Sequence, residues 1–295
     1  MSALRGAWRS LRRRPSSLLG LGLIAFFAAV ALAAPVLAPT PAGTRDAYLI
    51  PQDGYSPDPV LPSRKHLFGT TEQQYDLYYG MVWGTRTAFK VALFVVLTSL
   101  LIGVVLGGAA GFYGGWIDEG LMRFTDIVLA FPDLVLAVVI VSVTRPGLFN
   151  VMVSVMLVSW PSYARLLRGD VLSIKERDFV AAARALGASD ARILFRHIIP
   201  NCIYPVLVVA SLSIGRIVIT AAALSFLGLG APVGYADWGQ LISLSRNWIL
   251  GASGSPFAYW HTLFIPGAAI FLFVLGWNLL GDGVRDILDP RQQGT

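Results

Sequence analysis

Asp133 and Arg216 are the residues with the clearest chemical implication, because each places a charge inside an otherwise apolar stretch of the sequence. Arg216 follows the start of its stretch, near residue 201, by 15 residues, or about 23 Å along an α-helix. Charged side chains at such depth in a membrane usually pair with one another or line a wet cavity. We therefore expect both side chains to face inward, either as the polar lining of a transport path or as a structural ion pair.

The chain contains no motif that would indicate an enzyme active site. It lacks the G-x-x-x-x-G-K-[ST] phosphate-binding loop, the G-x-S-x-G nucleophile motif and the H-E-x-x-H zinc motif. Its single cysteine, Cys202, excludes an intrachain disulfide and a multi-cysteine metal site, and its histidines (His66, His197 and His261) are scattered. We therefore predict no catalytic residue, no cofactor and no metal site in this chain.

A charged segment, 168–197, predicts a short helix that starts at Asp178 and ends at Gly187. Asp178 suits a helix N-terminus, and glycine suits the left-handed position after a helix. Ser189 is positioned to cap a second short helix that runs through Arg196. The expected apolar face of the first helix consists of Phe179, Ala182, Ala183 and Leu186. Such a helix–turn–helix is a candidate joint to a soluble partner, although periodicity alone favours an ordinary amphipathic loop.

Four glycines, Gly103, Gly107, Gly111 and Gly115, recur at a strict spacing of four residues. A stripe of glycines on one helix face lets two helix backbones approach closely, which is how helices associate in lipid. The stripe predicts either a tight seam to a partner subunit or close packing inside this subunit.

The elements that must position these residues are membrane-spanning helices. The chain has 295 residues, of which 55% are hydrophobic and 14% charged, and a mean hydropathy of +0.65. Soluble domains are closer to one quarter charged, and a helix needs about 20 apolar residues to cross a bilayer. The apolar runs predict an all-α bundle of six transmembrane helices at residues 18–38, 88–112, 120–143 (interrupted by Pro132), 147–166, 201–229 and 261–281.

The net charge of +6 indicates membrane orientation here, not nucleic acid, because the basic residues flank the hydrophobic spans. The positive-inside rule places residues 1–16, 113–120, 168–197 and 283–295 in the cytoplasm, so both ends of the chain lie inside. A cleaved signal peptide is the alternative for the first run, since Ala31-Leu32-Ala33 resembles a cleavage site.

The chain divides into three parts by composition. Residues 1–38 form the cytoplasmic N-terminus and first span, and residues 39–87 form an external loop and pre-span segment with little helix, being rich in proline and glycine. Residues 88–295 form a five-helix core that includes the loop 168–200. Within this core, residues 231–260 predict a short amphipathic helix, either lying in the membrane interface or packed on the other spans.

The segment Ala181–Gly187, with Ile193 and then Ile199-Pro200-Asn201, resembles the cytoplasmic "EAA" loop of bacterial ABC importer permeases. More narrowly, the chain resembles the C-type permease subunit of dipeptide, oligopeptide and nickel importers. The resemblance covers nearly the whole chain. Other segments that share it are His66–Ala88, Gly111–Asp118, Trp160–Arg165, Leu224–Gly230 and Asn278–Arg291.

This resemblance implies a type I ABC importer permease (MetI-like) fold with an extra N-terminal span, in the inner or plasma membrane of a bacterium or archaeon. It implies a second permease subunit, two cytoplasmic ATPases that bind ATP and Mg²⁺, and an extracytoplasmic substrate-binding protein. Peptides are the expected substrates, ahead of nickel chelates or other small solutes. The residues it implies for coupling to the ATPase are Asp178, Phe179, Ala181, Ala182, Ala183, Leu186, Gly187, Ile193 and Pro200.

The chain departs from the family pattern at several positions. Ala181 replaces the glutamate that gives the loop its name, and Ala221 stands where an acidic residue is common. Two alternatives of other classes stay open at this point. One is a secondary transporter in which Asp126, Asp133 and Arg216 relay a coupling ion or proton, and the other is a purely structural membrane scaffold.

Overall fold

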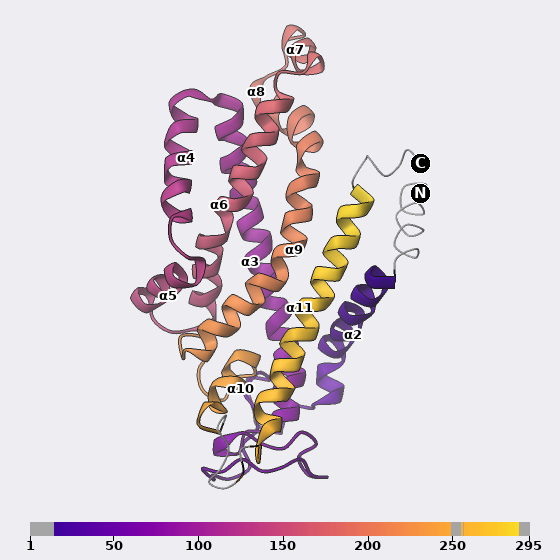
Figure 1. The fold of residues 1–295 in the computed structure, drawn as a ribbon, viewed down its shortest axis with the longest axis vertical. Coiled ribbons are helices and arrows are strands. Elements are labelled where there is room, and N and C mark those ends of the chain that lie inside the picture. Colours follow the sequence, from indigo (N-terminus) through magenta and orange to yellow (C-terminus); the bar gives the residue numbers. More distant parts are fainter. Residues whose placement is uncertain (1–14, 249–254, 256, 289–295) are drawn as a thin grey trace.

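The computed structural model describes residues 15–248, 255 and 257–288, and all regular elements within those residues are helices. Five long helices run along the molecule, namely α2 (Pro15–Leu37), α3 (Leu77–Tyr113), α6 (Leu148–Ile174), α9 (Ile199–Phe226) and α11 (Trp260–Leu288) (Figure 1). The shorter elements are η1 (Glu72–Gln74), α4 (Gly115–Leu129), α5 (Asp133–Thr144), α7 (Asp178–Ala185), α8 (Asp190–Arg192), the π-helical η2 (Ile193–Ile198), α10 (Trp238–Leu244) and η3 (Arg246–Trp248). The predicted all-α fold is therefore confirmed, while the N-terminal arginines before residue 15 lie outside the described residues.

The predicted span at 120–143 is not one straight helix. It consists of α4 and α5, which are bent by 92° at the break between them. Pro132 explains the break, because it has no backbone N–H and disfavours helical backbone at the residue before it. By length and composition, the described helices provide four candidate membrane spans, or five if the bent pair counts as one.

Helix α3 begins earlier in the sequence than predicted, within the segment 39–87 that was expected to hold little helix. The helix begins at Leu77 and not near residue 88, and the Asp76 carboxylate caps it by accepting a hydrogen bond from the Tyr79 backbone N–H at 2.8 Å. These turns are buried because Gly84 leaves space for the Trp238 ring of α10. Residues 77–87 mix aliphatic residues with aromatic, polar and glycine residues, so hydropathy alone gives little sign that they continue the span.

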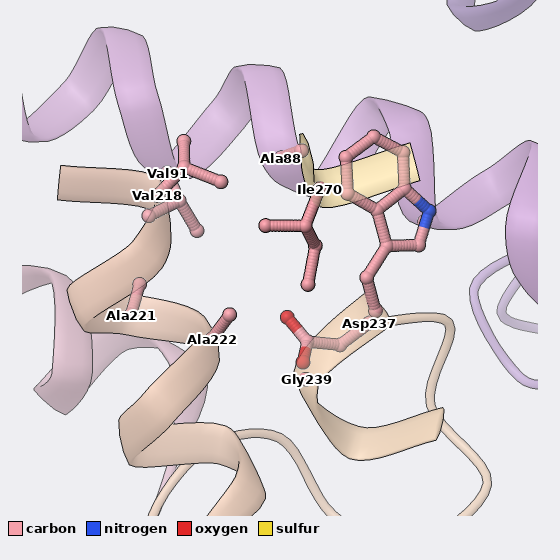
Figure 2. A pocket seen from close by; sticks show the side chains of 10 residues that line it. Ala88, Val91, Val218, Ala221, Ala222, Asp237, Gly239 and Ile270 are labelled. Carbon is pink, nitrogen blue, oxygen red and sulfur yellow. The ribbon is translucent and has the colours of Figure 1, made fainter. Parts of the chain in front are cut away.

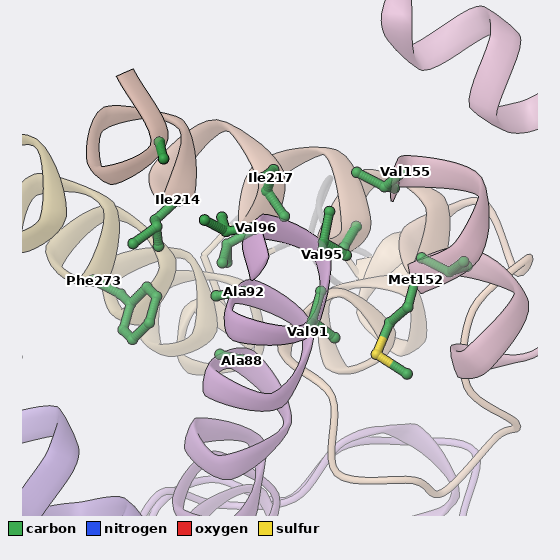
Figure 3. Close-up of a cluster of buried hydrophobic side chains, with 14 of the residues drawn as sticks. Ala88, Val91, Ala92, Val95, Val96, Met152, Val155, Ile214, Ile217 and Phe273 are labelled. Carbon is green, nitrogen blue, oxygen red and sulfur yellow. The ribbon is translucent and has the colours of Figure 1, made fainter. Parts of the chain in front are cut away.

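Helix α3 is the axis of the bundle. Its buried residues Val91 and Val95 lie among side chains from α6 and α9, and Phe273 of α11 packs beside the same helix (Figure 3). Figure 1 shows α2 and α11 together along one side of this axis and α4 on another. A single apolar helix surrounded by neighbours explains why Val95 and Ala92 are fully buried.

The glycine stripe of α3 packs against α6 of the same chain. A Cβ atom added at Gly107 would lie 2.3 Å from the Ala164 carbonyl oxygen, and one at Gly103 would lie 2.5 Å from the Tyr163 Cβ. Gly111 meets Val171 in the same way, at 2.8 Å. The stripe therefore serves packing inside this subunit, whereas Gly115 lies beyond the end of α3.

Arg86 connects α3 to α2 at a proline. Pro35 has no N–H, so the carbonyl oxygen of Ala31, one helical turn earlier, lacks its usual donor. The Arg86 Nε donates a hydrogen bond to that oxygen at 2.5 Å, and its guanidinium lies 5.0 Å from the Trp83 ring centroid. Inside a bilayer each unsatisfied backbone group is costly, so this contact fixes α2 on the bundle.

We expect Gly107→Ala to destabilise the protein by about 1–3 kcal/mol, because the added methyl group forces α3 and α6 apart. Gly108→Ala is the matched control, since its Cβ would meet its nearest neighbours at 3.7–3.9 Å. The thermal unfolding midpoint of the purified protein in detergent measures the difference. Equal midpoints for the two variants would contradict the importance of the seam.

We expect Arg86→Met to lower the stability by about 1–3 kcal/mol, because it leaves the Ala31 carbonyl oxygen without a donor. Adding Pro35→Ala to that variant restores an N–H at position 35 within the same helix, so most of the loss should be recovered. Thermal unfolding of the single and double variants provides the measurement. Additive losses, with no recovery, would show that Arg86 acts in another way.

Candidate functional site

The segment between α6 and α9 forms a compact elbow, residues 175–198. Helix α7 ends in a tight turn at Gly187, whose φ of 77° lies in the left-handed region that glycine favours. The Ala188 N–H donates to the Ala183 carbonyl oxygen at 3.1 Å and closes the turn. The predicted short helix with a glycine at its end is thus present.

The second part of the elbow differs from the predicted separate helix. Ser189 makes no side-chain capping hydrogen bond, and α8 continues through the π-turn η2 into α9. Asp190–Phe226 is therefore one continuous helical body. The π-turn lies directly before Pro200, which cannot donate to the Arg196 carbonyl oxygen.

The side chains of the elbow divide into an exposed and a buried set. Leu186 is 89% exposed and Phe179 is 44% exposed, and together with Ala182 they form an apolar surface that we name the elbow patch. Ala181, Gly187 and Pro200 are also exposed. This arrangement leaves an uncovered apolar surface of the kind that another protein covers.

Two buried apolar residues, Ile193 and Val180, pack the elbow against the helix bundle. Ile193, which the family resemblance places among the coupling residues, is fully buried and packs in the apolar core next to the elbow. Val180 is also fully buried, although the predicted apolar face did not include it. Its apolar side chain next to Phe179 was the only sign in the sequence that it packs inward. Ala183 is half-buried and packs against the same core.

Charged contacts tie α6, which leads into the elbow, to its neighbours. Arg168 makes two hydrogen bonds to the Asp118 carboxylate of α4, at 2.6 and 2.8 Å, and Arg165 pairs with Asp126. The Lys175 ammonium donates to the Gly111 carbonyl oxygen at 3.0 Å. Bidentate and charge-assisted bonds of this kind fix geometry, so the elbow is anchored to both α3 and α4.

Asp133 and Arg216 are brought together as an ion pair. The Arg216 guanidinium lies 2.7 Å from the Asp133 carboxylate, which stands in the first turn of α5, where a helix dipole favours negative charge. The Arg216 side chain is 51% exposed and that of Asp133 39%. The pair borders a small pocket that is also lined by Ser159 of α6 and Thr220 of α9.

The two segments predicted to be external join into one platform, defined by residues 46–76 and 231–248. The Ile50 N–H donates to the Gly234 carbonyl oxygen at 2.8 Å, and the Ala236 N–H to that of Tyr48 at 2.7 Å. Glu72 accepts from the Trp248 indole at 3.2 Å. The sequence predicted a short helix in 231–260 that lies either in the membrane interface or on the other spans. The structure shows the second arrangement: α10 packs on the spans, and its Trp238 and Leu241 are buried.

Asp237 anchors α10 at the base of the platform. Its carboxylate accepts a hydrogen bond from the Gln240 backbone N–H at 2.8 Å, as a helix N-cap. Figure 2 shows the carboxylate at the edge of a small apolar pocket, beside Ala222 and Ile270. Burial raises the pKa of Asp237 above its ordinary value, because the charged form is poorly solvated there.

Two family models match the chain. Residues 103–294 match the model described as binding-protein-dependent transport system inner membrane component, and residues 2–54 match the N-terminal TM domain of oligopeptide transport permease C. The dipeptide transport system permease protein DppC of Alkalihalophilus pseudofirmus is 39% identical over 293 residues, which cover 99% of this chain and 91% of that protein. The glutathione transport system permease protein GsiD of Pectobacterium atrosepticum is 41% identical over 230 residues, 78% of this chain and 74% of that protein.

The fold also resembles a solved structure, an inward-facing conformation of the MetNI methionine ABC transporter. The match has a TM-score of 0.57 at 17% identity and covers 72% of this chain and 97% of that chain. At this identity the similarity concerns the fold alone, and it agrees with the MetI-like fold expected from the sequence.

We expect the pH dependence of stability to reveal the buried Asp237. The pKa of Asp237 is higher in the folded protein than in the unfolded chain, so the folded protein keeps this proton to a higher pH. The stability of the wild type therefore falls relative to that of Asp237→Asn as the pH rises above 3.8, the ordinary pKa of an aspartate. Asparagine keeps the helix cap and carries no charge. Unfolding midpoints of both proteins between pH 4 and pH 8 test this, and a constant difference across that range would contradict it.

Proposed function

The chain belongs to the family of binding-protein-dependent transport system inner membrane components, and from this premise we propose that it is one of two permease subunits of an ATP-driven importer for di- or oligopeptides. The match of residues 2–54 to an oligopeptide permease domain and the identity to a dipeptide permease over 99% of the chain support the peptide class. The relative named as a glutathione permease supports it as well.

In this proposal the chain crosses the inner membrane six times, with both of its ends in the cytoplasm. The crossings are α2, α3, the bent pair α4–α5, α6, α9 and α11. Helix α6 is less apolar than the other long helices. It packs on α3, and its Arg165 and Arg168 pair with carboxylates of α4, so these charged groups are not exposed to lipid without a partner. The elbow end of the bundle is rich in Arg and Lys, which the positive-inside rule assigns to the cytoplasm.

The elbow patch is the proposed contact with a cytoplasmic ATPase. Phe179, Ala182 and Leu186 form an apolar surface at the tip of the bundle, and α7 is short enough to sit in a groove of another protein (Figure 1). When two ATPases close on ATP, a contact at α7 would move α6 and α9 as rigid bodies, because both helices are fixed to the elbow. ATP and Mg²⁺ would bind to the ATPases, and this chain would supply no catalytic group.

The platform at the opposite end of the bundle is the proposed face toward the extracytoplasmic binding protein. Because residues 46–76 and 231–248 are hydrogen-bonded into one body, they would act as a single docking surface and not as two separate loops. The second permease subunit would complete the path between platform and elbow.

The Asp133–Arg216 pair is the proposed polar lining on this subunit's side of the path. Its position on α5 and α9, half-exposed in the single chain, leaves it facing a second subunit or water. A proton or ion relay is less well supported, because Asp126 and Asp133 are each paired with an arginine, and arginine does not lose its proton.

The test uses the complex of this chain with its second permease, ATPases and binding protein, reconstituted in lipid vesicles with ATP inside. We expect di- or oligopeptides to stimulate ATP hydrolysis and to be taken up. Leu186→Glu should reduce both strongly, because loss of a central apolar contact costs about 2 kcal/mol or more, which is roughly 30-fold or more in affinity for the ATPase.

Leu186→Met is the matched control, since it keeps an apolar side chain of similar size at a position exposed to solvent. It should retain ATPase binding and uptake. Co-purification of the ATPases with Leu186→Glu at wild-type yield would refute the elbow contact. Peptide uptake driven by an ion gradient in the absence of ATP would refute the importer itself.

A further inference from the structure

Helices α2 and α11 contact each other closely at one end and separate toward the other. Near the elbow end, a Cβ atom added at Gly20 would lie 2.7 Å from the Leu280 backbone nitrogen, so the two backbones nearly touch. Toward the platform end a groove opens between the same two helices, with α3 as its floor. The residues that line this α2–α11 groove are Phe26, Phe27, Val30, Leu37, Phe68, Tyr78, Met81, Val82, Thr85, Trp238, Trp260, Phe264, Ile265, Ala268, Ala269 and Leu272.

The groove offers no free polar group from its deeper walls. The Tyr78 hydroxyl donates to the Leu37 carbonyl oxygen at 3.2 Å, and the Thr85 hydroxyl to that of Met81 at 3.0 Å. The Trp238 indole also donates to the Met81 carbonyl oxygen, at 3.2 Å. With these groups already satisfied within the chain, the deeper walls of the groove offer apolar contact and shape to an occupant.

The dimensions of the groove match one leaflet of a bilayer. On α11 the lining runs from Trp260 to Leu272, which is about 18 Å of helix. The hydrocarbon core of a bilayer is about 30 Å thick, so one leaflet occupies about 15 Å. Trp260 and the neighbouring Tyr259 and Trp248 gather at one end of this stretch, where aromatic side chains mark the boundary between hydrocarbon and headgroups.

Both walls of the groove face the bilayer. Helices α2 and α11 are each long and apolar enough to cross a membrane, and they lie on the outside of the bundle (Figure 1). Phe264, in the middle of the α11 wall, is 65% exposed. The groove is open on its outer side and holds about 470 Å³ of space, which lipid hydrocarbon fills more readily than water because the walls are apolar.

We propose that the α2–α11 groove is a binding site for a phospholipid acyl chain from the leaflet on the platform side. The chain fills the wedge between the two helices and completes the packing of α2 where direct helix contact ends. This site is independent of the transported substrate, and it assigns to the N-terminal helix a lipid-dependent attachment to the core.

The test uses the assembled transporter in vesicles that contain a phospholipid with a diazirine at the end of one acyl chain. After irradiation, mass spectrometry of the digested protein should locate lipid adducts at groove residues such as Phe264 and Val30. Ala268→Phe fills the groove and should reduce these adducts several-fold. The matched control is Ala25→Phe, which places the same side chain on an exposed position of α2 outside the groove and should leave the adducts unchanged.

A second measurement keeps the proposal testable if Ala268→Phe fails to assemble. Benzoylphenylalanine in place of the exposed Phe264 should crosslink to phospholipid upon irradiation of the assembled transporter. Crosslinks to the second permease, or to residues 249–256 of this chain, would assign the groove to a polypeptide and overturn the proposal. Adducts spread evenly over all lipid-facing surfaces, with no effect of Ala268→Phe, would also overturn it.

Discussion

The direct contact between the backbones of α3 and α6 is the constraint on which the rest of the structure depends. Lipid offers no hydrophobic driving force between helices, so association rests on close packing and hydrogen bonding. Gly107 meets the Ala164 carbonyl region with no room for a methyl group, and Gly103 and Gly111 extend the same contact along α3. With α6 fixed in this way, the other sides of α3 are free to hold α2, α9 and α10. The elbow and the Asp133–Arg216 pair are both positioned from this frame.

Charged groups in the bundle act as links between helices. Arg86 satisfies a carbonyl oxygen that Pro35 leaves free in α2, Arg168 binds Asp118 of α4, and Arg216 binds Asp133 of α5. Each contact joins two different helices, and each satisfies a group that would be costly to leave alone in an apolar medium. Arginine suits this task because it stays charged and offers several donors in a fixed geometry.

The continuous helix from Asp190 to Phe226 connects the two ends of the molecule. It begins in the elbow, carries Arg216 in its second half and contacts α10 of the platform. Under the proposed function, a displacement at the elbow patch would therefore reach the polar pair and the platform through one rigid element. The α2–α11 groove lies away from this connection, which separates attachment of the N-terminal helix from the coupling path.

The sequence by itself determined the all-α membrane class, the approximate place of most long helices, the glycine turn at Gly187 and the family. These features depend on local composition and on motifs, which are readable along the chain. Only the tertiary structure decided that the glycine stripe faces α6, that Ile193 and Val180 are buried under the elbow, and that α3 begins at Leu77. It also decided that the two external segments are one body and that Arg86 meets Ala31. The reason is physical: each of these features depends on packing between segments distant in sequence, and residue type fixes what a side chain can bind but not which helix lies beside it.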